Sequence, residues 1–246
     1  MSRKFILLIG LFLFSSRTHG QVLISLLLGD NLNSGKIEFG LDGGLTLSSL
    51  SGLGKSSALS SFNLGFYFDI KTKDSSWLVH TGVIVKSTLG AEGLPVYSLD
   101  QPDLDKTYEG GSVERKLSYF NVPFMLKYRF RNQLFMEAGP MFGLLYKAKD
   151  TFHNTVQGNE VTCEKDIRDG YHPIDAGLMA GVGYRLMKGY GMNLGVRYYF
   201  GLVDVTVDDS GASIANRSLY FTVGIPIGAG KAAERAAEKA KEKEGK

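Results

Sequence analysis

The amino-acid sequence predicts an all-β protein that folds as an eight-stranded, antiparallel, up-and-down transmembrane β-barrel. Three observations indicate this fold: apolar and polar residues alternate in eight long segments, long and short connections take turns between those segments, and a secretory-signal pattern stands at the N-terminus. The 246 residues include 31 glycines and only 6 prolines. After residue 14 no apolar run approaches the roughly 18 residues that a spanning helix needs, which excludes a helical membrane protein.

The segment 174–186 shows the alternation most clearly. Apolar or aromatic side chains occupy every even position from Ile174 to Leu186, whereas most odd positions hold glycine or a charged residue such as Asp175 or Arg185. A period of two is that of a β-strand with one apolar face, and it does not fit a helix. The same test predicts seven further strands, each as long as the roughly 9–11 residues of a tilted membrane strand. These seven strands are expected at 36–47, 61–71, 76–87, 116–130, 133–148, 191–203 and 217–227.

The connections between the predicted strands are long and short in turn. The long ones are expected near 48–60, 88–115, 149–173 and 204–216, and the short ones at 72–75, 131–132 and 187–190. Long loops at one end and tight turns at the other are typical of outer-membrane barrels, and a soluble sandwich gives no reason for this alternation.

The N-terminal residues have the features of a signal peptide. Arg3 and Lys4 precede a ten-residue apolar run, and small residues at Thr18 and Gly20 precede a predicted cleavage site before Gln21. The alternative is a membrane anchor, but the apolar run is too short to span. The expected organisation is a signal peptide at 1–20, a periplasmic segment at 21–35, the barrel at 36–227 and a charged periplasmic tail at 228–246.

Charge and cysteine content exclude several classes of protein. Removal of residues 1–20 takes Arg3, Lys4 and Arg17 from the 28 basic residues, which leaves 25 against 25 acidic residues and a net charge of zero. Nucleic-acid binding, which needs a basic surface, is therefore not expected. The single Cys163 excludes a disulfide scaffold and a cysteine-rich zinc site.

The polar faces of the strands are predicted to meet inside the barrel. A soluble barrel would have them outside, but the long strands, the aromatic residues at the strand ends and the signal peptide favour a lipid-facing apolar surface. Eight strands leave an interior just wide enough for side chains, so we expect a plug of salt bridges, with a proton or ion path as the alternative. The candidate lumen network is Glu38, Asp42, Asp69, Lys127, Glu137, Asp175, Arg185 and Arg197. Lys86, Arg129 and His80 are expected on the same polar faces.

The long loops are predicted to be acidic. Carboxylates outnumber basic residues in 88–112 and in 149–170, and the last long loop adds Asp208 and Asp209. Besides solubility, this charge suggests contact with divalent cations or with a basic partner at the cell surface. No spacing matches the EF-hand calcium loop. Cys163 is expected in the exposed loop 149–170, where a free thiol and an intermolecular disulfide are the functional alternatives and a chance position without a role is the favoured interpretation.

Three segments resemble the small outer-membrane β-barrels of Bacteroidota-type bacteria, the "porin family" or PorT-like group. They are 22–44, 119–146 and 175–202, and they cover most of the predicted mature chain. The resemblance implies a location in the cell outer membrane, reached through a Sec-type signal peptide. Some members of that group are tied to protein secretion and gliding.

The sequence predicts no catalytic, cofactor or metal site. We expect a non-enzymatic structural or interaction protein whose loops and periplasmic ends bind partners, with a link to secretion or envelope assembly. A narrow porin for small solutes is the alternative. A surface hydrolase is a weaker one, because no Ser/His/Asp spacing accompanies His153 or His172.

Overall fold

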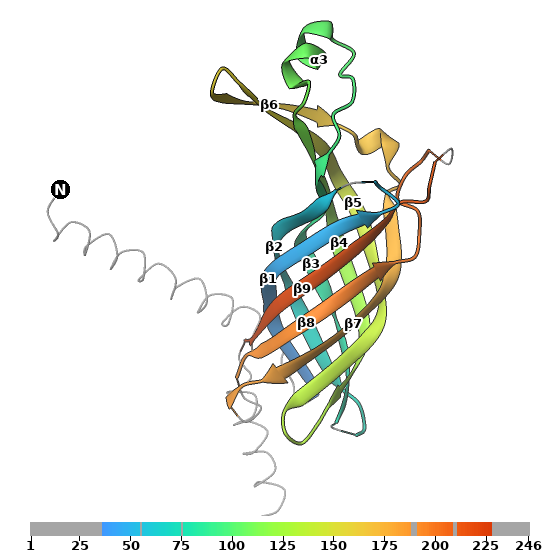
Figure 1. Cartoon of the computed structure of the whole chain (residues 1–246). Helices are drawn as coiled ribbons and strands as arrows, with labels where there is room; N and C mark the ends of the chain where they lie inside the picture. The colour runs from blue at the N-terminus through green and yellow to red at the C-terminus, as the bar shows by residue number, and fades with distance from the viewer. Residues whose placement is uncertain (1–35, 55, 75, 188–190, 209–210, 228–246) are drawn as a thin grey trace, which may run out of the picture.

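Eight antiparallel strands close into a ring in the computed structural model of the chain, which describes residues 36–54, 56–74, 76–187, 191–208 and 211–227 (Figure 1). The order around the ring is β4-β3-β2-β1-β9-β8-β7-β5, and pairing of β4 with β5 closes it. The predicted fold class is therefore confirmed. The segments 1–20, 21–35 and 228–246 lie outside the described residues. The strands of the ring are β1 (Ile37–Ser51), β2 (Ser57–Lys71), β3 (Trp77–Leu94), β4 (Ser112–Arg129), β5 (Leu134–Val156), β7 (Ile174–Arg185), β8 (Asn193–Gly201) and β9 (Ala215–Pro226).

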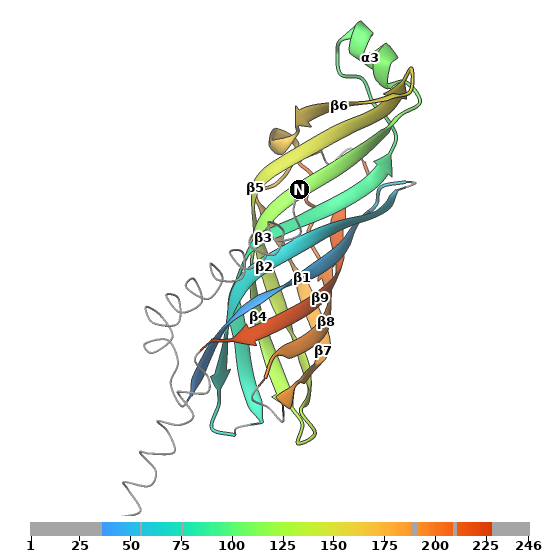
Figure 2. The same ribbon diagram turned by 90° about the vertical axis from the view of Figure 1, so that its left-hand side faces the viewer.

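Structured elements extend beyond the ring at the long-loop end. β3 and β5 continue well past their predicted ends, and β5 turns into a further strand, β6 (Asn159–Asp166), that pairs only with β5. A short helix, α3 (Pro102–Tyr108), and a 3-10 turn (Arg168–Gly170) complete this region. Both views place α3 and β6 on the same side of the ring (Figures 1 and 2). The expectation of plain loops at 88–115 and 149–173 was wrong, because the strands keep pairing beyond the barrel wall.

The outer wall of the ring is apolar and the interior is polar or aromatic. On β7, Leu178 and Val182 are 53% and 60% exposed, whereas Met179 and Arg185 are 1% and 2% exposed. This is the arrangement that a lipid environment favours. Aromatic side chains gather at the short-turn end, where Trp77 packs edge-on against Tyr128 with ring centroids 4.8 Å apart.

The predicted inward position of Lys86 was wrong. Between Ile84 and Ser87, β3 contains one residue more than the facing part of β4, so a β-bulge interrupts the alternation. Ile84 and Ser87 are buried, whereas Val85 and Lys86 both face outward. A single extra residue reverses the direction of every side chain that follows it, and a strict period of two assigns the wrong face there.

Inward glycines make room for large side chains. A Cβ atom on Gly40 would lie 2.3 Å from the ring of Tyr67, and one on Gly181 would lie 2.7 Å from Cγ of Arg197. The glycine on one strand therefore leaves the space that the large side chain of the neighbouring strand occupies. Among the described residues, no helix has the length and apolarity to cross a membrane.

Candidate functional site

Arg197 on β8 forms the centre of a buried charge network in the barrel interior. Its Nε donates to Oε1 of Glu137 on β5 at 2.5 Å, and its Nη1 donates to Oδ2 of Asp42 on β1. Arg197 is 5% exposed and Glu137 is 4% exposed. One guanidinium thus joins two carboxylates that come from different sides of the ring.

Asp69 on β2 forms the second centre. It accepts hydrogen bonds from Nζ of Lys127 at 2.9 Å and from Nδ1 of His80 at 2.6 Å. Nε2 of His80 lies 3.2 Å from Nη2 of Arg197. A guanidinium only donates, so Nε2 accepts and the single proton of a neutral imidazole is on Nδ1. Lys127 also lies 3.9 Å from Glu137, which closes the network into a ring of side chains.

A third group closes the interior near the short turns. Arg185 on β7 binds both carboxylate oxygens of Glu38 on β1, at 2.8 and 2.7 Å. The hydroxyl of Tyr67 donates to Glu38, and Asn193 donates to that hydroxyl. This bidentate pair spans the bore between strands that are not neighbours in the sheet.

The charges in this part of the interior balance. Four carboxylates face four cations, and His80 is neutral in the tautomer that its partners select. A set of buried charges is stable only when its members are paired, since leaving one uncompensated costs several kcal/mol. Arg129 belongs to the set because its Nη2 lies 3.7 Å from Oδ2 of Asp69. We call this set the lumen network: Glu38, Asp42, Asp69, Glu137, Lys127, Arg129, Arg185, Arg197 and His80.

Asp175 lies apart from the lumen network. It accepts a hydrogen bond from the amide of Asn216 at 2.8 Å and lies near the hydroxyl of Tyr199. The other seven sequence-predicted candidates lie within the lumen network.

The sequence analysis missed Phe135, which contacts the lumen network. Phe135 is 3% exposed, and Nζ of Lys127 lies 4.2 Å from its ring centroid. An apolar residue on a polar strand face gives no signal in the sequence.

The half of the interior nearer the long loops is filled mainly by large neutral side chains, with the buried carboxylate of Asp175 among them. Tyr119, Tyr199 and Tyr220 are 0%, 0% and 1% exposed, and they pack with buried methionines and leucines in one continuous core. The interior therefore has two layers, a charged one near the short turns and an aromatic and apolar one above it.

Beyond the ring, the long connections form a packed cap. The ring of Phe152 lies 5.0 Å from that of Tyr97 and 5.9 Å from that of Tyr108, so β5 holds the β3–β4 connection. Arg115 donates two hydrogen bonds to the fully buried Asp150, to which the Tyr97 hydroxyl also donates. Burial and the Asp150 carboxylate raise the pKa of Tyr97. We call this region, residues 95–111 and 148–172, the outer cap.

Residues 25–207, well over half of the chain, match the family described as "Outer membrane protein beta-barrel domain". The chain belongs to this outer membrane β-barrel family. Its apolar wall therefore lies in outer-membrane lipid. The Bacteroidota or PorT-like type is a finer assignment than this match carries.

Solved structures of similar fold are small outer-membrane barrels. They include the attachment invasion locus protein Ail of Yersinia pestis in complex with the heparin analogue sucrose octasulfate (11% identity, TM-score 0.42, covering 78% of this chain and 99% of that one). Another is OprG from Pseudomonas aeruginosa (13% identity, TM-score 0.35, covering 79% and 95%). At these values the likeness carries no argument about function. No curated protein matches the sequence.

Some of the acidic residues in and beside the outer cap of this outer membrane barrel form ion pairs. Lys149 contacts Glu164, and Lys116 binds Glu114 at 2.7 Å. His153, a candidate in the weak hydrolase alternative, lies 3.6 Å from Glu114 and 3.6 Å from Glu160. Within the parts of the chain that the structure describes, no group of three or more His, Cys, Asp or Glu could hold a metal ion.

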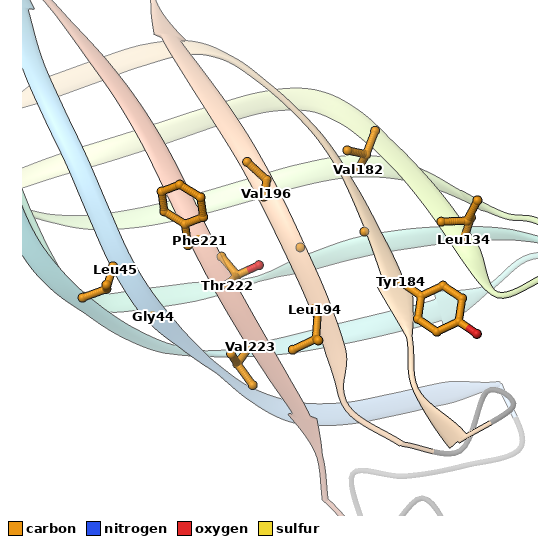
Figure 3. A pocket seen from close by; sticks show the side chains of 12 residues that line it. Gly44, Leu45, Leu134, Val182, Tyr184, Leu194, Val196, Phe221, Thr222 and Val223 are labelled. Atoms are coloured by element: carbon orange, nitrogen blue, oxygen red, sulfur yellow. The ribbon is translucent and has the colours of Figure 1, made fainter.

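The lipid-facing wall of the barrel carries a shallow apolar hollow of about 580 Å³ across β1, β9, β8 and β7 (Figure 3). Short outward side chains such as Val182 and Val196 line it. A second hollow of about 620 Å³ lies beside Trp77 and Leu126. Both are on the surface that meets acyl chains, so neither indicates a passage through the barrel.

Proposed function

We propose that this protein is a non-enzymatic outer-membrane barrel that acts as a structural and interaction protein. In this proposal its outer cap and its periplasmic ends bind protein partners, and its bore does not carry solutes. One observation carries the proposal: a balanced charge network and, above it, a layer of tyrosines and methionines fill the interior.

The energetics of the lumen network support a closed bore. A continuous aqueous path would need Arg197 to separate from Glu137 or Asp42, and Lys127 to separate from Asp69. Each separation would leave a charge in a confined space of low dielectric constant, which costs several kcal/mol. The network therefore stabilises one packed state and does not resemble the lining of a water-filled channel.

The outer cap has the properties of a docking surface. Phe152 and the Arg115–Asp150 pair fix its two connections to each other, so it is already ordered without a partner. Its exposed positions include Asp103, Glu109 and Glu160, which favour a partner with a basic surface or contact with divalent cations.

The resemblance of 22–44, 119–146 and 175–202 to the PorT-like group supports a finer proposal. In it, the protein belongs to the Bacteroidota type of outer-membrane barrel, and its partners belong to secretion or envelope assembly. Cross-linking in native membranes, followed by affinity purification and mass spectrometry, tests this. Recovery of secretion or assembly components with wild type, and their loss when 102–109 is replaced by a Gly/Ser linker, is the expected result.

Conductance measurement in planar bilayers decides between this proposal and a channel. The purified wild-type protein is expected to give no steady current. Reproducible open steps whose ion selectivity changes in Glu137→Gln or Arg197→Gln would overturn the proposal and establish a porin.

A narrow porin remains the second candidate because of two buried carboxylate oxygens. Oδ1 of Asp42 and Oε2 of Glu137 have no hydrogen-bond partner among the described residues, although both atoms are enclosed in the barrel. Such oxygens are suitable contacts for a permeating cation or water, and the selectivity of any open step in the two variants would report on them.

A further inference from the structure

Two β-bulges lie on either side of the same short stretch of β4. On β3 the extra residue falls between Ile84 and Ser87, and on β5 it falls between Leu145 and Lys147. Both face residues 118–121 of the strand between them. A β-bulge redirects a side chain but interrupts regular strand pairing. The presence of two bulges at the same height on the wall therefore needs an explanation.

Each bulge brings a lysine to the outer wall. Lys86 and Lys147 are both exposed, and each follows an outward residue directly instead of alternating with an inward one. Lys116 of β4 faces the same way and is 45% exposed. The hydroxyls of Thr88 and Ser118 lie 3.4 Å apart on these strands. We call the five residues Lys86, Thr88, Lys116, Ser118 and Lys147 the outer lysine patch.

The outer lysine patch lies where the apolar wall ends. On β5 the outward residues are apolar or aromatic from Leu134 to Tyr146. Twelve steps of about 3.3 Å at a tilt of roughly 40° give a height of about 30 Å, close to the ~25 Å apolar band of outer-membrane barrels. Lys147 follows Tyr146 directly and therefore lies at the outer boundary of the membrane.

Aromatic side chains form the membrane side of the patch. The rings of Phe120 and Tyr146 are stacked with centroids 4.5 Å apart, and Nζ of Lys86 lies 5.7 Å from the centroid of Phe62. An aromatic surface below a cationic one suits a lipid whose chains lie against the rings and whose headgroup lies above them.

Nearby acids balance the charge of the patch only in part, since Glu164 also interacts with Lys147 and Lys116 at longer range. Glu114 pairs with Lys116, and Glu164 pairs with Lys149 further from the membrane. Within the described ranges neither Lys86 nor Lys147 forms an ion pair, so the boundary between wall and cap keeps a positive excess. At this depth the anions available to it are lipid phosphates.

We propose that the outer lysine patch binds the phosphoryl headgroup of an anionic lipid in the outer leaflet. Lys86, Lys116 and Lys147 contact the phosphoryl oxygens, Thr88 and Ser118 donate hydrogen bonds, and the acyl chains pack on Phe62, Phe120 and Tyr146. The bulges of β3 and β5 are the means by which the fold places its cations at this depth.

Native mass spectrometry of the detergent-purified full chain tests the proposal. Diphosphoryl lipid A, enzymatically dephosphorylated lipid A and inorganic phosphate are the three probes. The test variant is Lys86→Gln/Lys116→Gln/Lys147→Gln, and the control Lys71→Gln/Lys73→Gln/Arg131→Gln removes the same charge at the short-turn end. The triple arginine variant of the patch is the conservative rescue.

Wild type, the control and the arginine variant are expected to bind the diphosphorylated lipid alike. The glutamine variant should bind it roughly 100-fold more weakly, since each lysine near an anionic surface contributes about a five-fold factor in affinity. Heat-modifiable migration in gels shows that each variant is folded. Equal binding by the glutamine variant and wild type, equal binding of the dephosphorylated lipid, or inorganic phosphate displacing the lipid at equal molar concentration would each overturn the proposal.

Discussion

Arg197 and Glu137 form a fully enclosed ion pair, with Nε and Oε1 2.5 Å apart, between strands β8 and β5, which are not neighbours in the ring. β7 lies between them in the wall, so the pair joins side chains across the inside of the sheet. Contacts of this kind stabilise the barrel by joining strands that do not pair with each other in the wall.

Glu137→Ala should destabilise the barrel by about 3–5 kcal/mol, because it leaves Nε of Arg197 without its carboxylate and the buried lumen network with one uncompensated positive charge. Urea unfolding in detergent micelles, followed by intrinsic fluorescence, measures the change. Glu164→Ala on β6, where the side chain is 59% exposed, is the control and should change stability by less than about 0.5 kcal/mol. Similar losses in the two variants would contradict the role of the lumen network.

Leu178→Arg should cost about 2–4 kcal/mol, since Leu178 is 53% exposed and pairs with Pro140, half-way along the apolar part of β5. The penalty for a charge on the lipid face falls toward the membrane boundary. Val182→Arg, closer to the short turns, should therefore cost less. Folding yields in lipid vesicles compare the two, and an equal or reversed order would mean that the membrane is placed wrongly on the wall.

Phe152→Ala should loosen the outer cap and leave the ring intact. Phe152 is 0% exposed and contacts both Tyr97 and Tyr108, so its loss removes the contact that holds the β3–β4 connection. Trypsin should then cut after Lys106 at least about ten-fold faster, as the connection opens at lower free energy. Phe142→Ala, the same change on the lipid face of the same strand, is the control. Unchanged cleavage in Phe152→Ala would show that other contacts order the cap.

The outer cap should weaken at alkaline pH. Burial and the neighbouring Asp150 raise the pKa of Tyr97 above its ordinary value of 10.0, so the folded cap favours the neutral phenol. An unfolded cap loses this proton first, and the stabilisation is complete below pH 10 and declines as the pH rises above it. Tyr97→Phe keeps the ring and should remove this component of the pH dependence. Proteolysis rates against pH check it, and identical profiles would exclude Tyr97 as the cause.

Period-two patterning predicted the ring, its topology and most side-chain directions, because a membrane wall demands one apolar face from every strand. It failed at Lys86, where one extra residue in β3 changed the face. It also could not indicate β6, because that strand lies outside the membrane and its partly buried side carries only Val161 and Cys163 as apolar residues.

The sequence did not show which charged side chains pair with each other inside the barrel. Arg185 and Glu38 are 147 positions apart and meet only because the ring brings β7 opposite β1. The sequence places both on polar faces but does not fix the stagger of eight strands, which decides which charges share a level. Asp175 illustrates this: the same pattern that selects Glu137 selects it, yet its height in the barrel gives it Asn216 as a partner.

The seam between β1 and β9 has a consequence for the order of assembly. Leu41 pairs with Ile225 and Leu47 with Leu219, so β1 and β9 are each other's second neighbour in the ring. Both strands therefore keep one unpaired edge until they meet. Contacts so distant along the chain are slow to form, and the ring cannot close while β9 is still being delivered. Until then the unfinished sheet has two unpaired edges, which makes the nascent chain dependent on a chaperone or an insertion machine that shields them.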